Sequence, residues 1–274
     1  MPDLLIPFAF QCVLAIAAFA AALRIARASR PVWVGVCIAS LAAMLLWPLM
    51  RVFPVEPIDL LGAPTVACIE LTGLAIPAVL LFAIAARHMP KKSDGRAILL
   101  LTAVAGVYFV KAGWWMLAPV SGGLGPTNVD AHGVCRQSTG YTCAAASMVT
   151  MLRARDIPAD ETEMARLSYT QVGGGATDSR VLWALERKLA ATELRPRYQR
   201  LDLAGLIAAS KPCLVQLDWG YFTSHMVPVL SATEQTVVIG DPLIGKREMS
   251  AADFVRKWKG AAITVESVFP PSAQ

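Results

Sequence analysis

The sequence predicts an α-helical membrane region with four transmembrane helices, followed by an α+β domain with an antiparallel sheet. The chain has 274 residues, of which 55% are hydrophobic and only 16% are charged. That composition is more apolar than an average soluble domain. The first 120 residues hold long stretches almost free of charge, whereas charged residues after that point reach the density of an ordinary globular protein. This change predicts a transmembrane domain at 1–120 and a second domain at 121–274.

Four apolar stretches predict the membrane spans. A helix needs about 20 apolar residues to cross a hydrocarbon core about 30 Å thick. The predicted spans cover about 4–23, 31–50, 65–86 and 97–117. The first is not predicted to be a cleaved signal, because its apolar run is long and no basic segment precedes it. Within the third, Pro77 is predicted to bend the helix.

The distribution of basic residues predicts the orientation of these spans. Two connections are rich in cations, the first with Arg24, Arg27 and Arg30, the second with Arg87, Lys91, Lys92 and Arg96. Cytoplasmic loops carry an excess of Lys and Arg, so both connections are expected in the cytoplasm. We therefore expect a multi-pass protein of a bacterial inner membrane, with membrane lipid around it and a periplasmic or extracellular second domain.

The net charge of +5 does not indicate a nucleic-acid partner. Residues 1–120 hold nine basic and five acidic residues, whereas residues 121–274 hold sixteen basic and fifteen acidic ones. Most of the positive excess therefore belongs to the predicted cytoplasmic connections. The second domain has almost no excess of basic over acidic residues with which to bind phosphates, which argues against nucleic-acid binding.

Two ionisable residues fall inside predicted spans. Glu70 lies in the third span and Lys111 in the fourth, and both are expected about 10 Å below the outer face at ~1.5 Å per residue. Placing a charged group inside a membrane costs free energy, so each such residue calls for a structural or functional explanation. One interpretation is an interhelical ion pair or snorkelling to the interface, and the other is a polar site that faces a substrate.

The second domain places a cysteine at the expected start of a helix. After the Gly/Pro-rich linker "SGGLGPTNVDAHG", the chain reads "QSTGYTCAAAS", and apolar residues recur at helical spacing from Cys143 to about Arg153. Unpaired N–H groups at a helix N-terminus favour a thiolate over a thiol. Cys143 is therefore a candidate nucleophile, and the alternative is a small buried cysteine in a core helix.

A histidine and an aspartate follow on one predicted hairpin. The segments "MVPVLSA" and "TVVIG" read as β-strands around a turn near Thr233 and Glu234. If the turn is centred on Thr233, His225 and Asp241 are direct cross-strand partners, with Cβ atoms about 5 Å apart. The carboxylate can then accept a hydrogen bond from the imidazole, fix its tautomer and support its protonated form.

An amide donor precedes the cysteine. Acyl transfer through a thiolate develops an oxyanion, which is commonly held by the backbone N–H of the nucleophile and one side-chain amide. Gln137, six residues before Cys143, can supply that amide. The segment "LDWGYFTSH" leads directly into His225, so Trp219, Tyr221 and Phe222 are predicted to line a substrate groove or to pack in the core.

The remaining motifs predict no cofactor. The segment "VGGGATDSR" lacks the Lys and the preceding strand of a phosphate loop, so it is read as a turn before a helix. His132, Cys135 and Cys143 are too scattered for a closed zinc site, so no metal is predicted. In an oxidising compartment, Cys135 and Cys213 are candidates for a disulfide that leaves Cys143 free.

The order Gln, Cys, His, Asp resembles the papain-like cysteine peptidases, and within them the C39 family. The resemblance covers roughly residues 130–265 and rests on "RQSTGYTCAAASMVTML", "KPCLVQLDW", "SHMVPVL" and "VIGDPLIGKREMSAADFVRKWKG". It implies an α+β papain-like fold in which Cys143 attacks, His225 is base and then acid, Asp241 orients His225, and Gln137 completes the oxyanion hole. Ala144 departs from the glycine that usually follows the nucleophile in this family.

The resulting expectation is a membrane-anchored cysteine peptidase that cleaves a peptide or precursor protein at the outer face of the inner membrane. Anchoring would confine the site to substrates near the bilayer, such as a tethered precursor or a peptide that emerges from an export or assembly system. Two alternatives stay open. One is a peptidoglycan-directed amidase or endopeptidase, and the other is a non-catalytic peptide-binding module.

Overall fold

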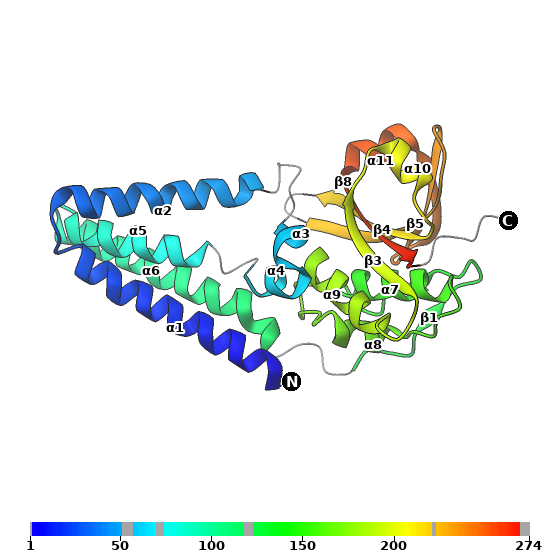
Figure 1. Ribbon diagram of the computed structural model, residues 1–274, viewed down its shortest axis with the longest axis horizontal. Coiled ribbons are helices and arrows are strands. Elements are labelled where there is room, and N and C mark those ends of the chain that lie inside the picture. The colour runs from blue at the N-terminus through cyan, green and yellow to red at the C-terminus, as the bar shows by residue number, and fades with distance from the viewer. Residues whose placement is uncertain (1, 51–56, 70–73, 118–122, 221–222, 269–274) are drawn as a thin grey trace. The chain divides into compact units, whose positions relative to one another are not determined.

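The structure is a computed structural model, and it describes residues 2–50, 57–69, 74–117, 123–220 and 223–268. The chain divides into two compact units, Met1–Ala118 and Pro119–Gln274. The first unit is helical and the second holds the described strands, as Figure 1 shows. Each unit is built around its own packed contacts and is described separately below.

Four long helices dominate the first unit. They are α1 (Pro2–Ile25), α2 (Arg30–Met50), α5 (Ala75–His88) and α6 (Lys92–Gly113), with the short helices α3 (Pro57–Leu61), α4 (Ala63–Ile69) and η1 (Trp114–Met116). Helix α5 packs against α1, α2 and α6. Small side chains are buried where these helices meet, namely Ala22 on α1, Ala26 directly after α1 and Ala83 on α5. Small residues let helix backbones approach closely, which suits packing without large interlocking side chains.

One of the four predicted membrane spans is supported. Among the residues whose placement is described, one helical segment, Phe8–Ile25, is long and apolar enough to cross a membrane. The described apolar part of α2, Arg30–Leu46, is shorter. The multi-pass membrane region therefore remains a hypothesis.

Within the third predicted span, 65–86, the described residues form the end of α4, up to Ile69, and helix α5 from Ala75, while residues 70–73 lie outside the described residues. With 14 residues, α5 is about 21 Å long, which is shorter than a hydrocarbon core of about 30 Å. Pro77 does not bend a long helix, as the sequence had suggested, but lies in the first turn of α5. The N–H groups of a first turn have no partner within the helix, so proline is tolerated there.

The predicted pair inside the membrane is not placed. Glu70 lies outside the described residues, and the side chain of Lys111 in α6 is likewise outside them. Both interpretations of this pair therefore stay predictions.

The second unit is an α+β domain. Its helices are α7 (Cys143–Arg153), α8 (Glu161–Leu167), α9 (Asp178–Lys188), α10 (Leu203–Ala208) and α11 (Ala251–Lys257). Its strands are β1 (Asn128–Val129), β2 (Cys135–Arg136), β3 (Leu194–Arg200), β4 (Cys213–Gly220), β5 (Thr223–Ala232), β6 (Thr236–Asp241), β7 (Gly245–Ser250) and β8 (Trp258–Ser267).

A six-stranded antiparallel sheet organises the domain in the order β3-β8-β4-β5-β6-β7. Helices α7, α8 and α9 lie on one side of this sheet, and α10 and α11 lie on the other, as Figure 1 shows. Alternate residues of the central strands, including Val215, Val227 and Ile239, pack with Phe254 of α11 in the core on that second side. The predicted α+β class with an antiparallel sheet is thus confirmed.

Helix α7 is the buried centre of the opposite side. Every residue from Ala144 to Leu152 is buried, because the helix contacts β5, α8 and α9 at once. Polar atoms fix its position on the sheet. The Ser147 hydroxyl donates to the Met226 carbonyl at 2.8 Å, and the Thr150 hydroxyl accepts from the Cys135 N–H at 2.9 Å. These bonds hold α7 against both β5 and the strand that precedes it in sequence.

The two cysteines considered for a disulfide, Cys135 and Cys213, are both free and fully buried. Burial, followed by the nearby charge of Glu161, raises the pKa of the Cys135 thiol to about 12. Burial also raises the pKa of the Cys213 thiol to about 11. Both groups are thiols rather than thiolates at neutral pH, so neither has the character of a nucleophile.

Candidate active site

Cys143 is the first residue of α7, with Thr142 at the N-cap position, as the apolar spacing predicted. Its side chain is partly buried, and the His225 imidazole is near enough to lower the pKa of its thiol. The backbone N–H groups of Met226 and Ala144 act in the same direction on this pKa. The structure therefore brings together the helix N-terminus and the β5 histidine that are 82 residues apart in the chain.

The surroundings of Cys143 favour its thiolate. Burial acts to raise the pKa of this thiol, since a charge is poorly solvated inside the protein. His225 and the N–H groups of Met226 and Ala144 outweigh burial, and the pKa lies below that of an ordinary cysteine. The pKa of the Cys143 thiol is thus lowered, whereas the pKa values of the Cys135 and Cys213 thiols are raised.

His225 is held between the sulfur and a carboxylate. Its side chain is buried, and its Nε2 lies 2.9 Å from Oδ1 of Asp241. Because Nε2 faces Asp241, Nδ1 is the ring nitrogen left to face Cys143. Burial acts to lower the pKa of His225, but Asp241 and Cys143 raise it to about 9. A protonated imidazole beside a thiolate is the state that this environment stabilises.

Asp241 is completely buried at the end of β6. Its Oδ1 accepts from both the His225 ring and the backbone N–H of Leu243, the latter at 2.9 Å. Burial acts to raise the pKa of this carboxyl, but the bonds from His225 and Leu243, together with the charge of Arg247, lower it below its usual range. Asp241 is therefore a fixed negative charge that favours the protonated form of His225.

The predicted hairpin exists, but its register is different. The paired residues are Ala232 with Val237 and, after a β-bulge, Val229 with Ile239. Continuing this register puts Asp241 opposite Val227, two residues from His225, rather than directly opposite His225. The difference arises because the turn runs from Thr233 to Thr236 and the bulge adds one residue to β5. The side chains still meet, since diagonal neighbours on a sheet are within reach of a long side chain.

Gln137 lies just after β2 and is bonded to the turn that follows Asp241. Its backbone N–H donates to the Pro242 carbonyl at 3.0 Å. Its Nε2 donates to the Thr139 carbonyl at 2.6 Å, and its Oε1 is buried without a partner. A primary amide has two N–H groups, so one bond to Thr139 leaves a second donor for a developing negative charge.

The predicted groove residues are placed in part. Trp219, at 44% exposure, lies with its ring centroid 4.7 Å from that of His225. Tyr221 and Phe222 fall outside the described residues. The indole thus lies beside the imidazole while part of it stays exposed to solvent.

Three further residues near the site were not identified from the sequence. Leu243 and Ile244 follow Asp241 in its turn and are 42% and 58% exposed, so they present apolar side chains next to the carboxylate. Arg136 donates through its guanidinium to the Leu243 carbonyl and fixes that turn. The signal for the first two was available, because "DPLIG" puts two large apolar residues in a turn. No local pattern indicates the role of Arg136.

The lowered pKa of Cys143 and the raised pKa of His225 predict how the reactivity of the site depends on pH. Alkylation of Cys143 by iodoacetamide should already be substantial below the pH at which an ordinary cysteine reacts, because its thiolate forms at lower pH. Acyl transfer from an amide substrate to Cys143 should fall as pH rises through about 9, where His225 loses the proton that the leaving amine needs. Rates from pH 5 to 11, with each modified cysteine identified by mass spectrometry, would check this. Alkylation of Cys143 that parallels that of Cys135 would contradict it.

Comparisons with known proteins concern mainly the second unit. The profile of the Peptidase C39 family matches residues 132–269. An uncharacterized protein of Methanothermobacter marburgensis is 26% identical over 133 residues, which cover 48% of this chain and 87% of that protein. The probable functional amyloid protease FapD of Pseudomonas fluorescens is also 26% identical over 133 residues, or 47% of this chain and 58% of FapD.

Solved structures include similar domains. The peptidase domain of Streptococcus ComA, a bifunctional ABC transporter involved in quorum sensing, aligns with a TM-score of 0.44 and 20% identity over 48% of this chain and 96% of that domain. A double-glycine motif protease from an AMS/PCAT transporter, solved with its leader peptide, aligns with a TM-score of 0.41 and 21% identity over 54% of this chain and 97% of that protease. Because the family profile spans half of the sequence and includes Cys143, His225 and Asp241, this chain belongs to the peptidase C39 family.

Proposed function

We propose that this protein is a membrane-anchored cysteine peptidase that cleaves a peptide or precursor protein with Cys143, His225, Asp241 and Gln137. The observation that carries the proposal is the placement of Cys143 at the start of α7, where His225 lowers the pKa of its thiol, together with the 2.9 Å contact between His225 Nε2 and the buried Asp241 carboxylate. Membership of the peptidase C39 family supports a peptidase role. The FapD relatives, which are named proteases, support it as well.

The first half of the reaction forms an acyl-enzyme. The Cys143 thiolate attacks the carbonyl carbon of the scissile peptide bond, and the π electrons move to oxygen as an oxyanion. The Cys143 backbone N–H and the second Nε2 hydrogen of Gln137 donate to that oxyanion. Protonated His225 then gives its proton to the leaving nitrogen. The C–N bond breaks, an amine departs and a thioester remains on Cys143.

The second half restores the enzyme. His225, now neutral, takes a proton from water while the water oxygen attacks the thioester carbonyl. The tetrahedral intermediate collapses, the C–S bond breaks and the carboxylic acid is released. Asp241 does not exchange a proton in either half. Its fixed charge orients the imidazole and stabilises the protonated form.

The rim of the site suits an extended peptide with apolar side chains. Trp219 lies beside His225, and Leu243 and Ile244 extend from the turn after Asp241, all with large exposed apolar surfaces. Exposed apolar residues that gather in one place are typical of binding surfaces. These three are candidates for the residues that contact substrate on either side of the scissile bond.

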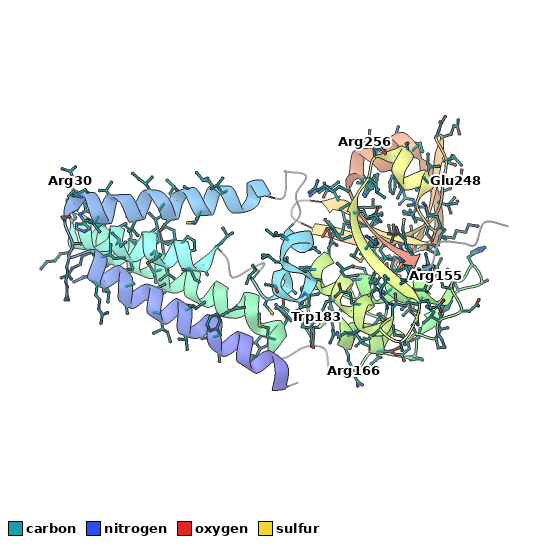
Figure 2. The ribbon with its side chains drawn as sticks, viewed as in Figure 1. Arg30, Arg155, Arg166, Trp183, Glu248 and Arg256 are labelled. Atoms are coloured by element: carbon teal, nitrogen blue, oxygen red, sulfur yellow. The ribbon has the colours of Figure 1, made fainter. Side chains whose placement is uncertain are left out.

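The surface of the first unit supports a membrane anchor. Helices α1, α2 and α6 carry large apolar side chains that are well exposed, among them Phe10, Ile16, Ile38, Leu100 and Val107. Monomeric soluble proteins rarely expose apolar surface on this scale, whereas lipid tails would cover it. The α1–α2 and α5–α6 turns hold exposed basic residues, and Arg30 lies at this end of the unit in Figure 2. The catalytic domain follows the opposite end of α6, so we propose that it faces the periplasm.

Reporter fusions test the proposed topology. Alkaline phosphatase fused after Gln274 should be active, because the enzyme matures only outside the cytoplasm, and a fluorescent protein at the same position should report a cytoplasmic location only if the proposal is wrong. The matched control is fusion after Met89 in the basic α5–α6 turn, for which the opposite pattern is expected. An inactive phosphatase at the C-terminus with an active one at Met89 would reverse the orientation.

The peptidase itself is tested with a mixed peptide library and with purified cell wall. The full-length protein in detergent or nanodiscs should generate new peptide termini in the library, as measured by mass spectrometry. Release of peptides from cell wall, without cleavage of the library, would instead identify a cell-wall hydrolase. Binding of library peptides without any cleavage would identify a binding module.

A further inference from the structure

Most of the buried polar atoms without partners belong to the second unit. Among the described residues, four buried side-chain nitrogen or oxygen atoms lack a hydrogen-bond partner, and they belong to Gln11, Gln137, Glu161 and Asp241. Gln11 lies in the helical unit. Two of the other three belong to the proposed catalytic set. An unsatisfied buried group in a native protein calls for an explanation, and such groups recur at functional sites. Glu161 is therefore the one whose role remains to be explained.

Glu161 touches the segment that carries the oxyanion amide. It is the first residue of α8 and is completely buried. Its Oε1 accepts the backbone N–H of Ser138 at 2.9 Å, and Ser138 is the residue after Gln137. The backbone N–H of Glu161 donates to Thr127 at 2.9 Å, which anchors the start of α8 in turn. The carboxylate thus reaches across 23 residues of sequence to hold one peptide plane beside Gln137.

Ordinary helix chemistry does not explain this carboxylate. Acidic residues are common in a first turn because they face the positive end of the helix dipole, but they are usually exposed. Glu163, two residues later, fits that description, since it is partly exposed and pairs with Lys188. Burying a carboxylate beside a single N–H is costly. A buried charge with so few partners is retained where it holds another group in place.

The same segment is held from its other side. Arg136 bonds to the Leu243 carbonyl and the Gln137 N–H bonds to the Pro242 carbonyl, so both are attached to the turn after Asp241. The Glu161 carboxylate on α8 then accepts the backbone N–H of Ser138, which belongs to the next peptide unit. Gln137 is consequently fixed between two anchors, one on the Asp241 turn and one on a helix outside the catalytic set.

We propose that Glu161 is a positioning residue that aims the Gln137 amide at the oxyanion of the transition state. The inference rests on the proposed function. Glu161 acts through the Ser138 N–H, and what matters is an acceptor at the correct reach rather than a negative charge. Misplacing a catalytic group by about 1 Å can reduce a rate about a hundredfold, and loss of one oxyanion donor costs about 10²–10³ in kcat.

Two substitutions separate reach from charge. Glu161→Gln removes the charge but keeps an oxygen at the same distance, whereas Glu161→Asp keeps the charge but withdraws it by one methylene. We expect Glu161→Gln to retain acyl transfer within about threefold and Glu161→Asp to lower it at least about tenfold, within the range for a displaced oxyanion donor. The reverse ranking would show that charge is the working feature and would overturn the proposal.

Two named probes separate the oxyanion hole from the nucleophile. Acetylation of Cys143 by 4-nitrophenyl acetate passes through a carbonyl oxyanion before 4-nitrophenolate leaves, whereas alkylation by iodoacetamide displaces iodide without forming an oxyanion. Glu161→Asp should slow acetylation and leave alkylation unchanged, with both rates read at Cys143 by mass spectrometry. An equal fall in both rates would indicate general damage to the fold and would overturn the proposal.

A double-mutant cycle identifies the path of the effect. If Glu161 works through Gln137, Glu161→Asp should cost much less in a Gln137→Ala background than in the parent, whereas additive losses would exclude that path. Glu163→Gln on the same helix is the matched control and should leave both rates unchanged. A parent that is neither acetylated faster than its Gln137→Ala variant nor active on peptides would refute the proposed function. An active parent that is insensitive to Glu161→Asp would refute only this inference.

Discussion

Replacing Cys143 with serine should abolish peptide cleavage, with a loss of at least about a thousandfold. A serine hydroxyl at this position has the same helix N-terminus and the same histidine, but its proton is far harder to remove than that of a thiol with a lowered pKa. Neither attack on the carbonyl nor the thioester can then occur at a useful rate. The measurement is the rate at which new termini appear in the peptide library.

Cys213→Ala is the matched control for this loss. Cys213 is also a buried cysteine of the catalytic domain, but the pKa of its thiol is raised to about 11 and it lies in the core of the sheet. Its replacement should leave cleavage within about twofold, because a small apolar substitution removes little packing. Cleavage that survives in Cys143→Ser, or disappears equally in Cys213→Ala, would remove Cys143 from the mechanism.

Asp241→Asn should lower kcat by about 10²–10⁴, in line with loss of the orienting carboxylate in other triads. The amide keeps the shape of the side chain but removes the fixed charge that supports protonated His225. Its nitrogen would also be a buried donor where Asp241 presents an unpaired Oδ2. The imidazole would then favour its neutral form, and the Cys143 thiolate would lose its partner.

The pH profile makes this prediction specific. In the parent, activity should fall as pH rises through about 9, the raised pKa of His225. In Asp241→Asn that fall should move to lower pH, since the main group that raises the pKa is gone. Asp218→Asn is the control, because this carboxylate is exposed and pairs with Lys259. A loss of kcat without movement of the alkaline limb would assign Asp241 a structural role instead.

The candidate site was predictable from the sequence to the extent that its signals are local. Apolar spacing after Cys143 identified the start of α7, and the strand pattern around Thr233 identified the hairpin of His225 and Asp241. The register was not predictable, because a β-bulge depends on how β5 packs against its neighbours. The side chains of His225 and Asp241 are in contact although the register was mispredicted, since a shift by two residues keeps both on the same face of the sheet.

Glu161 could not be identified from its surroundings in the sequence. The segment "DETEMARL" reads as a capped helix with an acidic first turn, and Asp160 does accept the Glu163 N–H as an N-cap. Nothing local distinguishes the buried Glu161 from the partly exposed Glu163. The difference lies in which side of α8 faces the loop after β2, and residues far apart in the chain decide that.

The composition break, the apolar first helix, the cysteine at a helix start and the family of the second domain could be predicted from the sequence, because each depends on a short-range pattern or on the order of motifs. The diagonal contact of His225 with Asp241 and the bond between Glu161 and Ser138 could be found only in the folded protein. These features depend on contacts between distant segments. Hydrophobic periodicity predicts which face of an element is buried, but not which polar atom it meets there.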